Sequence, residues 1–165
     1  MKKRTLLVGL LLLATSAFAQ EGPNSVTFVS AAPVVVAPGH TAQVTMIFKV
    51  GGGYHINSHK PLDELLIPTE VKLSPPTEIM ISGIKYPQGQ ELNFPFSPDA
   101  KLSVYSGEFK VTAAVRPAQN APKGTFRVHG DLKFQACTDR QCFPPKKIPM
   151  QFDVKVEKSK RTRKG

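Results

Sequence analysis

Apolar and polar side chains alternate along four long segments of this chain, and that pattern limits its fold more than any other feature. The segments are residues 41–50, 109–116, 126–135 and 148–156. A period of two places one set of side chains in a core and the other in water, as in antiparallel sheets with one solvated face. No stretch of a dozen residues carries an apolar stripe at helical spacing without a proline. The chain is therefore predicted to be all-β.

Shorter strands and turns fill the intervals. Short strands are expected at residues 26–30, 54–56, 70–73 and 79–86. Turns rich in glycine and proline, such as Gly51-Gly52-Gly53, separate the strands. Residues 91–100 hold Pro95 and Pro98 among aromatic side chains, which predicts an ordered loop rather than a strand. About seven to nine short strands in one domain favour an immunoglobulin-like antiparallel β-sandwich.

The two ends of the chain have compositions of their own. Lys2, Lys3 and Arg4 precede an apolar run at residues 6–13, which leads to the small-x-small site Ala17-Phe18-Ala19. This layout is typical of a cleaved secretory signal, so we predict a signal peptide at residues 1–19 and a periplasmic protein. Residues 158–165 carry five basic side chains and no apolar one, which predicts a disordered basic tail. The folded domain is expected to span residues 20–157.

Most of the formal net charge of +10 belongs to these two ends. Three basic residues lie in the signal and five in the tail, which leaves 14 Lys and Arg against 12 Asp and Glu in residues 20–157. A nearly neutral domain gives no reason to expect a nucleic-acid partner. One interpretation of the tail is contact with an anionic membrane surface, to which each basic residue would contribute about 1 kcal/mol. The simpler interpretation is a solvated terminus.

Cys137 and Cys142 are the only cysteines, and in an exported protein they are expected to form one disulfide. A bridge across so short a loop contributes about 2 kcal/mol, at the low end for disulfides, so its position favours opening and closing. The apolar face of the preceding strand continues through Phe134 and Ala136, which predicts that Cys137 starts on the outward face. From the residues alone, an inert disulfide in a non-catalytic β-sandwich binding module stays open as an alternative.

A metal site is the other chemistry that these residues suggest. His55 and His59 are four residues apart and would complete a Cys2His2 set with the two cysteines. That spacing matters on a helix, whereas here it follows a glycine turn, and exported thiols oxidise more readily than they bind zinc. We therefore predict no metal and no cofactor.

Four segments of the chain resemble a known family. Phe134-Gln135-Ala136-Cys137 with Cys142-Phe143-Pro144-Pro145 resembles the active-site segment of the N-terminal periplasmic domain of the DsbD thiol:disulfide interchange protein family. Three further segments resemble that domain in the same order, and the resemblance extends over roughly residues 26 to 156. They are Gly53-Tyr54-His55-Ile56-Asn57-Ser58 with Lys60-Pro61, Tyr86-Pro87-Gln88-Gly89, and Val104-Tyr105-Ser106-Gly107-Glu108-Phe109.

The resemblance implies an immunoglobulin-like fold and a thiol:disulfide oxidoreductase of the protein-disulfide reductase type. Cys137 and Cys142 would take electrons from a thioredoxin-like or membrane-embedded thiol reductase and pass them to oxidised periplasmic client proteins. The resemblance also ranks Cys142 ahead of Cys137 as the sulfur that forms the mixed disulfide. Four residues separate the cysteines here, against five in the best-known members. Without a following membrane domain, the chain is expected to be a stand-alone relative acting on separate partners.

The resemblance further implies aromatic side chains around the disulfide. In the family a loop with an aromatic tip caps the cysteines, and here that loop is expected within residues 91–100, with Phe94 or Phe96 at its tip. Tyr54 stands where the family places an aromatic near the disulfide, and Phe143 follows Cys142 directly.

Overall fold

Three four-stranded sheets make up the part of the chain that the structure, a computed structural model, describes, which is residues 24–157. Their orders are β1-β3-β9-β6, β2-β12-β10-β5 and β11-β4-β8-β7. Nothing in residues 24–157 is helical, so this range holds no helix able to cross a membrane. The strands are β1 (Val26–Ala31), β2 (Val34–Val36), β3 (Ala42–Val50), β4 (His55–Asn57), β5 (Glu70–Ser74), β6 (Ile79–Lys85), β7 (Gln90–Phe94), β8 (Ser97–Tyr105), β9 (Glu108–Pro117), β10 (Gly124–Phe134), β11 (Ala136–Cys137) and β12 (Lys146–Val156).

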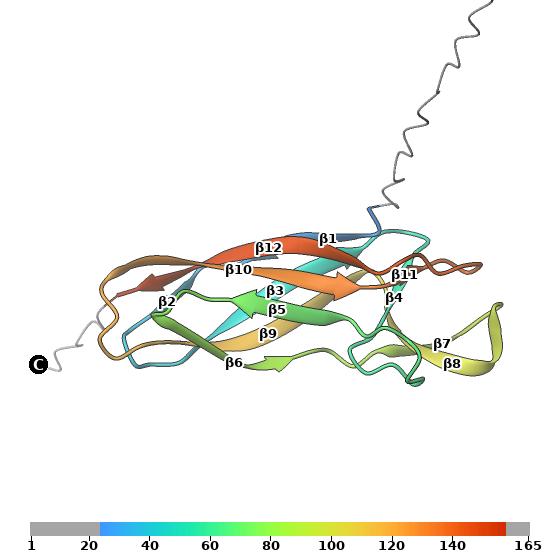
Figure 1. The fold of residues 1–165 in the computed structure, drawn as a ribbon, viewed down its shortest axis with the longest axis horizontal. Coiled ribbons are helices and arrows are strands. Elements are labelled where there is room, and N and C mark those ends of the chain that lie inside the picture. The colour runs from blue at the N-terminus through green and yellow to red at the C-terminus, as the bar shows by residue number, and fades with distance from the viewer. Residues whose placement is uncertain (1–23, 158–165) are drawn as a thin grey trace, which may run out of the picture.

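The first two sheets share one hydrophobic core, and Figure 1 shows them as the two layers of an elongated sandwich. β3, β9, β10 and β12 alternate buried and exposed positions along their length, as the period of two predicts. Met46, Phe48, Val111, Leu132 and Val154 are each fully buried in this core. The immunoglobulin-like β-sandwich is confirmed, with every strand pair antiparallel except β2 with β12.

The third sheet lies at one end of the sandwich and is built on continuations of core strands (Figure 1). β4 follows β3 through the glycine turn, in which Gly53 has a positive φ of 78° that glycine adopts without strain. β8 leads into β9, and β11 follows β10 after the single residue Gln135. The core therefore fixes the start of β4 and of β11 and the end of β8.

The prediction of a loop at residues 91–100 is wrong, because β7 and β8 form an antiparallel hairpin there. Pro95 and Phe96 are the turn between the two strands. Pro98 lies where the pairing register shifts, between the pairs Leu92–Leu102 and Phe94–Ser97. Neither proline occupies a position where the ladder needs a backbone N–H, so both are compatible with strand pairing.

The predicted strands are confirmed with ends that move by one or two residues, while β2, β7, β8 and β11 were not predicted. The predicted signal peptide at residues 1–19 and the basic tail at residues 158–165 lie outside the described residues. Both therefore stay predictions.

The core predicts a sharp contrast between two leucines. Leu132 has no exposed surface, whereas Leu65 is 91% exposed in a loop. We expect Leu132→Ala to lower the free energy of unfolding by about 2–5 kcal/mol, because it removes buried methyl groups and leaves a cavity. Leu65→Ala should change it by no more than about 0.5 kcal/mol. Urea unfolding of both variants measures the difference, and equal effects would contradict this position of the core.

Candidate functional site

Cys137 and Cys142 are bonded to each other and face one another as an isolated antiparallel bridge. Hydrogen bonds flank the pair: the Phe143 amide donates to the Ala136 carbonyl, and the Thr138 amide donates to the Gln141 carbonyl, both at 2.8 Å. The cysteines are therefore a non-hydrogen-bonded cross-strand pair, the arrangement that brings Cα atoms and side chains closest. Their Cα atoms are 3.9 Å apart. Local strand pairing is what lets so short a loop carry a disulfide.

The four residues between the cysteines form a turn organised by Thr138. Its hydroxyl lies 3.3 Å from the backbone amides of Arg140 and Gln141 and accepts hydrogen bonds from both. Arg140 and Asp139 approach to 4.0 Å with their side chains 90% and 68% exposed. An ion pair so exposed contributes little to stability. The turn is therefore exposed to solvent and is held by hydrogen bonds between its own residues.

The two sulfurs differ strongly in access. Cys137 is 1% exposed, whereas Cys142 is exposed. The prediction that Cys137 faces outward is therefore wrong. Gln135 interrupts the strand between β10 and β11, so the alternation of β10 does not carry over, and both Ala136 and Cys137 are buried. Cys142 is therefore the cysteine that is accessible from solvent, and Cys137 is buried.

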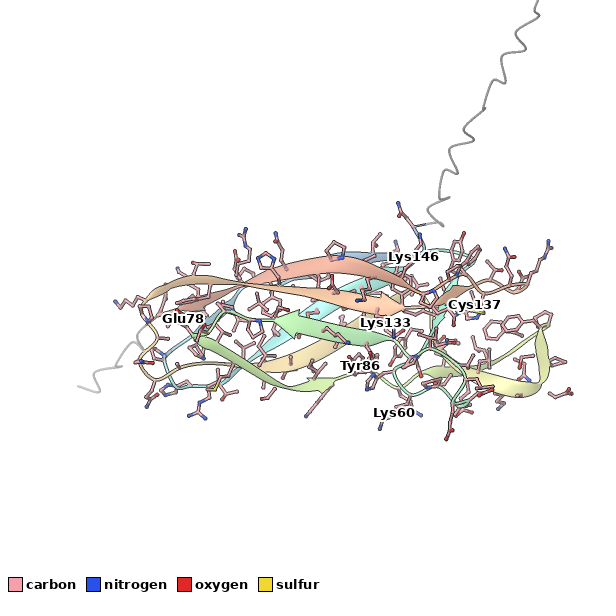
Figure 2. All side chains as sticks on the ribbon, viewed as in Figure 1. Lys60, Glu78, Tyr86, Lys133, Cys137 and Lys146 are labelled. Atoms are coloured by element: carbon pink, nitrogen blue, oxygen red, sulfur yellow. A yellow bond between two sulfur atoms is a disulfide. The ribbon has the colours of Figure 1, made fainter. Side chains whose placement is uncertain are left out.

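β4 lies alongside β11 and sets the surroundings of the buried cysteine. Cys137 pairs with His55 across the two strands, and Ala136 pairs with Ile56. The His55 ring is 3.9 Å from the Phe94 ring, centroid to centroid, and 6.2 Å from the Phe96 ring. The β7–β8 hairpin therefore lays two aromatic rings over the cross-strand partner of Cys137. Figure 2 shows Cys137 at the hairpin end of the molecule, remote from Glu78 at the other end.

His55 is 5% exposed, and burial lowers the pKa of its imidazole below the usual 6.5. Its Nε2 atom is buried and has no hydrogen-bond partner within the structure. Unpaired buried ring nitrogens are costly and uncommon, so this atom calls for an explanation.

The remaining aromatic residues that the sequence singled out also gather here. Tyr54 and Phe143 are half-buried, with ring centroids 6.1 Å apart. The Gln135 side-chain amide donates a hydrogen bond of 3.1 Å to the Phe143 carbonyl. Gln135 thereby ties the strand break to the residue after Cys142.

The structure thus brings together Cys137, Cys142, Tyr54, Phe94, Phe96 and Phe143, all of which the sequence pointed to. It does not assemble the alternative metal set. His59 stacks on Tyr86 at 3.7 Å and contacts the Thr69 carbonyl through Nδ1 at 3.0 Å. Within residues 24–157, no three or more His, Cys, Asp and Glu side chains form a group that could hold a metal ion.

Sequence reasoning gave His55 a role only in that metal alternative and gave Gln135 none, although both residues lie in segments that resemble the family. The signal available for His55 was its position in a short strand one residue after Tyr54. The local sequence pattern did not predict which strand His55 would pair with.

Comparison with known proteins gives one family for this arrangement. Residues 25–153 match the model of the family described as thiol:disulfide interchange protein DsbD, N-terminal. No curated protein sequence matches the chain.

Several solved structures are similar to this chain at low sequence identity. The N-terminal periplasmic domain of ScsB from Proteus mirabilis is 12% identical, with a TM-score of 0.51, and the match covers 79% of this chain and 52% of that one. The DsbD N-terminal domain of Neisseria meningitidis in its reduced form is 21% identical, with a TM-score of 0.45 and coverage of 78% and 84%. A complex of the DsbD and PilB N-terminal domains from that organism matches at 20% identity, a TM-score of 0.40, and coverage of 67% and 73%.

The unequal exposure of the sulfurs predicts unequal reactivity once the disulfide is reduced. We expect a small maleimide to label Cys142 faster than Cys137 by about tenfold or more, because exchange and alkylation both depend on access to the sulfur. Peptide mass spectrometry after a short pulse measures each site. The same pulse in denaturant provides the control and should label both alike. Equal labelling of the folded protein would contradict the burial of Cys137.

Proposed function

Because the chain belongs to the family of DsbD N-terminal domains, we propose that it acts in the periplasm as a thiol:disulfide interchange domain that relays electrons through Cys137 and Cys142. The observation that carries the proposal is a disulfide with one exposed and one buried sulfur. Such a pair has a single direction of attack from solvent, which is what an ordered relay needs.

The disulfide contributes little to the stability of the domain. It closes a six-residue hairpin end whose strands are already joined by backbone hydrogen bonds. Its contribution to folding is about 2 kcal/mol, and the sandwich has a hydrophobic core of its own. Opening the bridge therefore costs the domain little, which favours a redox role over a structural one.

Reduction of the domain takes two exchange steps. A thiolate of a reduced partner attacks Cys142 Sγ, the Cys137–Cys142 bond breaks, and Cys137 leaves as a thiolate that takes up a proton. The partner's second thiolate then attacks the partner sulfur that is bonded to Cys142, and Cys142 leaves. The partner is now oxidised, and the domain holds two electrons as two thiols.

Oxidation by a client runs the same steps in reverse. Cys142 attacks a client disulfide and forms a mixed disulfide, and one client sulfur leaves as a thiolate. Cys137 then attacks Cys142 Sγ, which re-forms the bridge and releases the second client thiolate. The donor is a thioredoxin-like or membrane-embedded thiol reductase, and the clients are oxidised periplasmic proteins.

The β7–β8 hairpin serves as the cap of this site. Phe94 lies directly over His55, and Phe96, which is 39% exposed, occupies the turn. These rings cover the strand partner of the buried sulfur and leave the exposed sulfur on the side of the Thr138 turn. The cap thus restricts exchange to partners that approach Cys142.

Single-cysteine variants test the order of attack. Cys137→Ala should form a stable mixed disulfide with a thioredoxin-like partner whose second cysteine is replaced and whose remaining cysteine is activated with thionitrobenzoate, because neither protein then holds a sulfur that resolves the adduct. Cys142→Ala should trap at least about tenfold less, because its remaining sulfur is buried. Non-reducing gel electrophoresis counts the adducts, and the double variant is the control. Efficient trapping by Cys142→Ala alone would reverse the assignment.

The reduction potential separates the relay from a non-catalytic binding module with an inert bridge. Structural disulfides of secreted proteins lie below about −300 mV, whereas exchanging ones lie higher. We expect a value above that limit when the domain is equilibrated with glutathione or dithiothreitol buffers. A value well below it, together with no exchange with a reduced thioredoxin, would rule the relay out.

A further inference from the structure

One buried group beside the disulfide has no part in the exchange steps as written. His55 is 5% exposed, and its Nε2 atom has no partner while the bridge is closed. Its ring is held in a fixed plane by stacking on Phe94, with an interplanar angle of 21°, and on Phe96, with an angle of 4°. A buried and oriented polar atom without a partner calls for a nearby group that could meet it.

Strand register identifies that partner. His55 is opposite Cys137 in the β4–β11 ladder, and side chains of directly opposed residues lie on the same face with Cβ atoms about 4.5–5.5 Å apart. In the closed bridge, the Cys137 sulfur is bonded to Cys142 and carries no proton. Opening the bridge creates a buried thiol or thiolate at this position, on the same face as the imidazole.

We infer that His55 is the proton carrier of the buried cysteine, a role that rests on the proposed relay. When Cys137 attacks the mixed disulfide, Nε2 of the neutral imidazole takes the thiol proton, and the Cys137–Cys142 bond forms. The bond from Cys142 to the partner breaks, and the partner sulfur leaves as a thiolate. In the opposite direction, the imidazolium returns the proton to Cys137 as that sulfur leaves.

The surroundings of the ring suit this task. Burial favours the neutral ring, so at neutral pH a nitrogen lone pair is available to accept a proton. His55 stacks on Phe94 and Phe96 from the hairpin and pairs with Cys137 from β11, and of these three residues only Cys137 can carry an exchangeable side-chain proton once the bridge is open. A thiolate leaving into such an apolar setting carries a large cost unless a proton or a hydrogen bond meets it. His55 is placed to supply either.

Ring closure can be measured without any protein partner. The reduced protein is mixed with dithiobis(nitrobenzoate), an aromatic disulfide whose released thiolate is coloured. Attack by Cys142 releases a first equivalent, and closure by Cys137 releases a second. In His55→Gln we expect the first phase to stay within about twofold and the second to slow by about tenfold or more, since general bases contribute at least that much.

The pH profile separates proton transfer from a merely structural role. Wild-type closure should keep a nearly constant rate from the lowered pKa of His55 up to the thiol range near about 8.5, because the imidazole substitutes for hydroxide there. In His55→Gln the rate should fall with the thiolate fraction as pH decreases. His59→Gln is the matched control, since it removes an imidazole from a second aromatic stack, on Tyr86, and both phases should keep their wild-type rates.

Three outcomes would overturn the inference. The first is an unchanged second phase in His55→Gln. The second is an equal slowing of both phases, which indicates distortion of the site. The third is a wild-type profile that tracks the thiolate fraction across the whole range, and this measurement needs no variant to fold. Failure of Cys142 to give a first phase would instead contradict the proposed relay, so the two failures are distinguishable.

Discussion

The pairing of β11 with β4 is the interaction on which the site depends. β11 consists only of Ala136–Cys137, and its two cross-strand pairs determine where Cys137, His55 and Cys142 lie. Pairing with Ile56 and His55 places Cys137 on the edge strand of the third sheet, where it is buried, and sets His55 directly opposite it. One residue pair further along, the chain leaves the sheet and turns back at Thr138, so Cys142 lies at the solvent edge. A single short ladder thereby makes two chemically identical sulfurs unequal.

That ladder is stable because the sandwich supports it from both sides. β4 continues from β3 and β11 continues from β10, and both core strands are long and regularly buried. The core therefore provides the stability, and the disulfide does not have to. A domain whose fold relied on this bridge would lose stability at each cycle of reduction. Here the flanking hydrogen bonds from Phe143 to Ala136 and from Thr138 to Gln141 join the two sides of the hairpin end without involving the sulfurs.

Local pattern predicted the parts of the fold that local pattern controls. The alternation in residues 41–50, 109–116, 126–135 and 148–156 reflects burial against a shared core, so it predicted both the strands and their inner faces. It failed where the reasoning crossed an interruption. Carrying the parity of β10 through Gln135 placed Cys137 outward, although the break resets the face. Pro95 and Pro98 led to the prediction of a loop where the β7–β8 hairpin lies, because the effect of a proline on strand pairing depends on register.

The candidate site shows the same division. The cysteines were predicted from their own contiguous segment, and the aromatic residues around them from the family resemblance. His55 as the strand partner of Cys137 is a contact over more than eighty residues, and no local signal determines which strand will lie opposite. The parallel pairing of β2 with β12 was missed for that reason too. Long-range register is a property of the assembled core.

The arrangement also explains why an aromatic cap and a buried histidine occur together. Stacking on Phe94 and Phe96 covers the His55 ring, and its Nε2 atom is buried without a hydrogen-bond partner among residues 24–157. The hairpin that covers the ring therefore also separates its nitrogen from bulk solvent. A proton released from a buried sulfur beside this ring would have no direct route to bulk water, and this is why the proposed proton transfer is assigned to an internal acceptor.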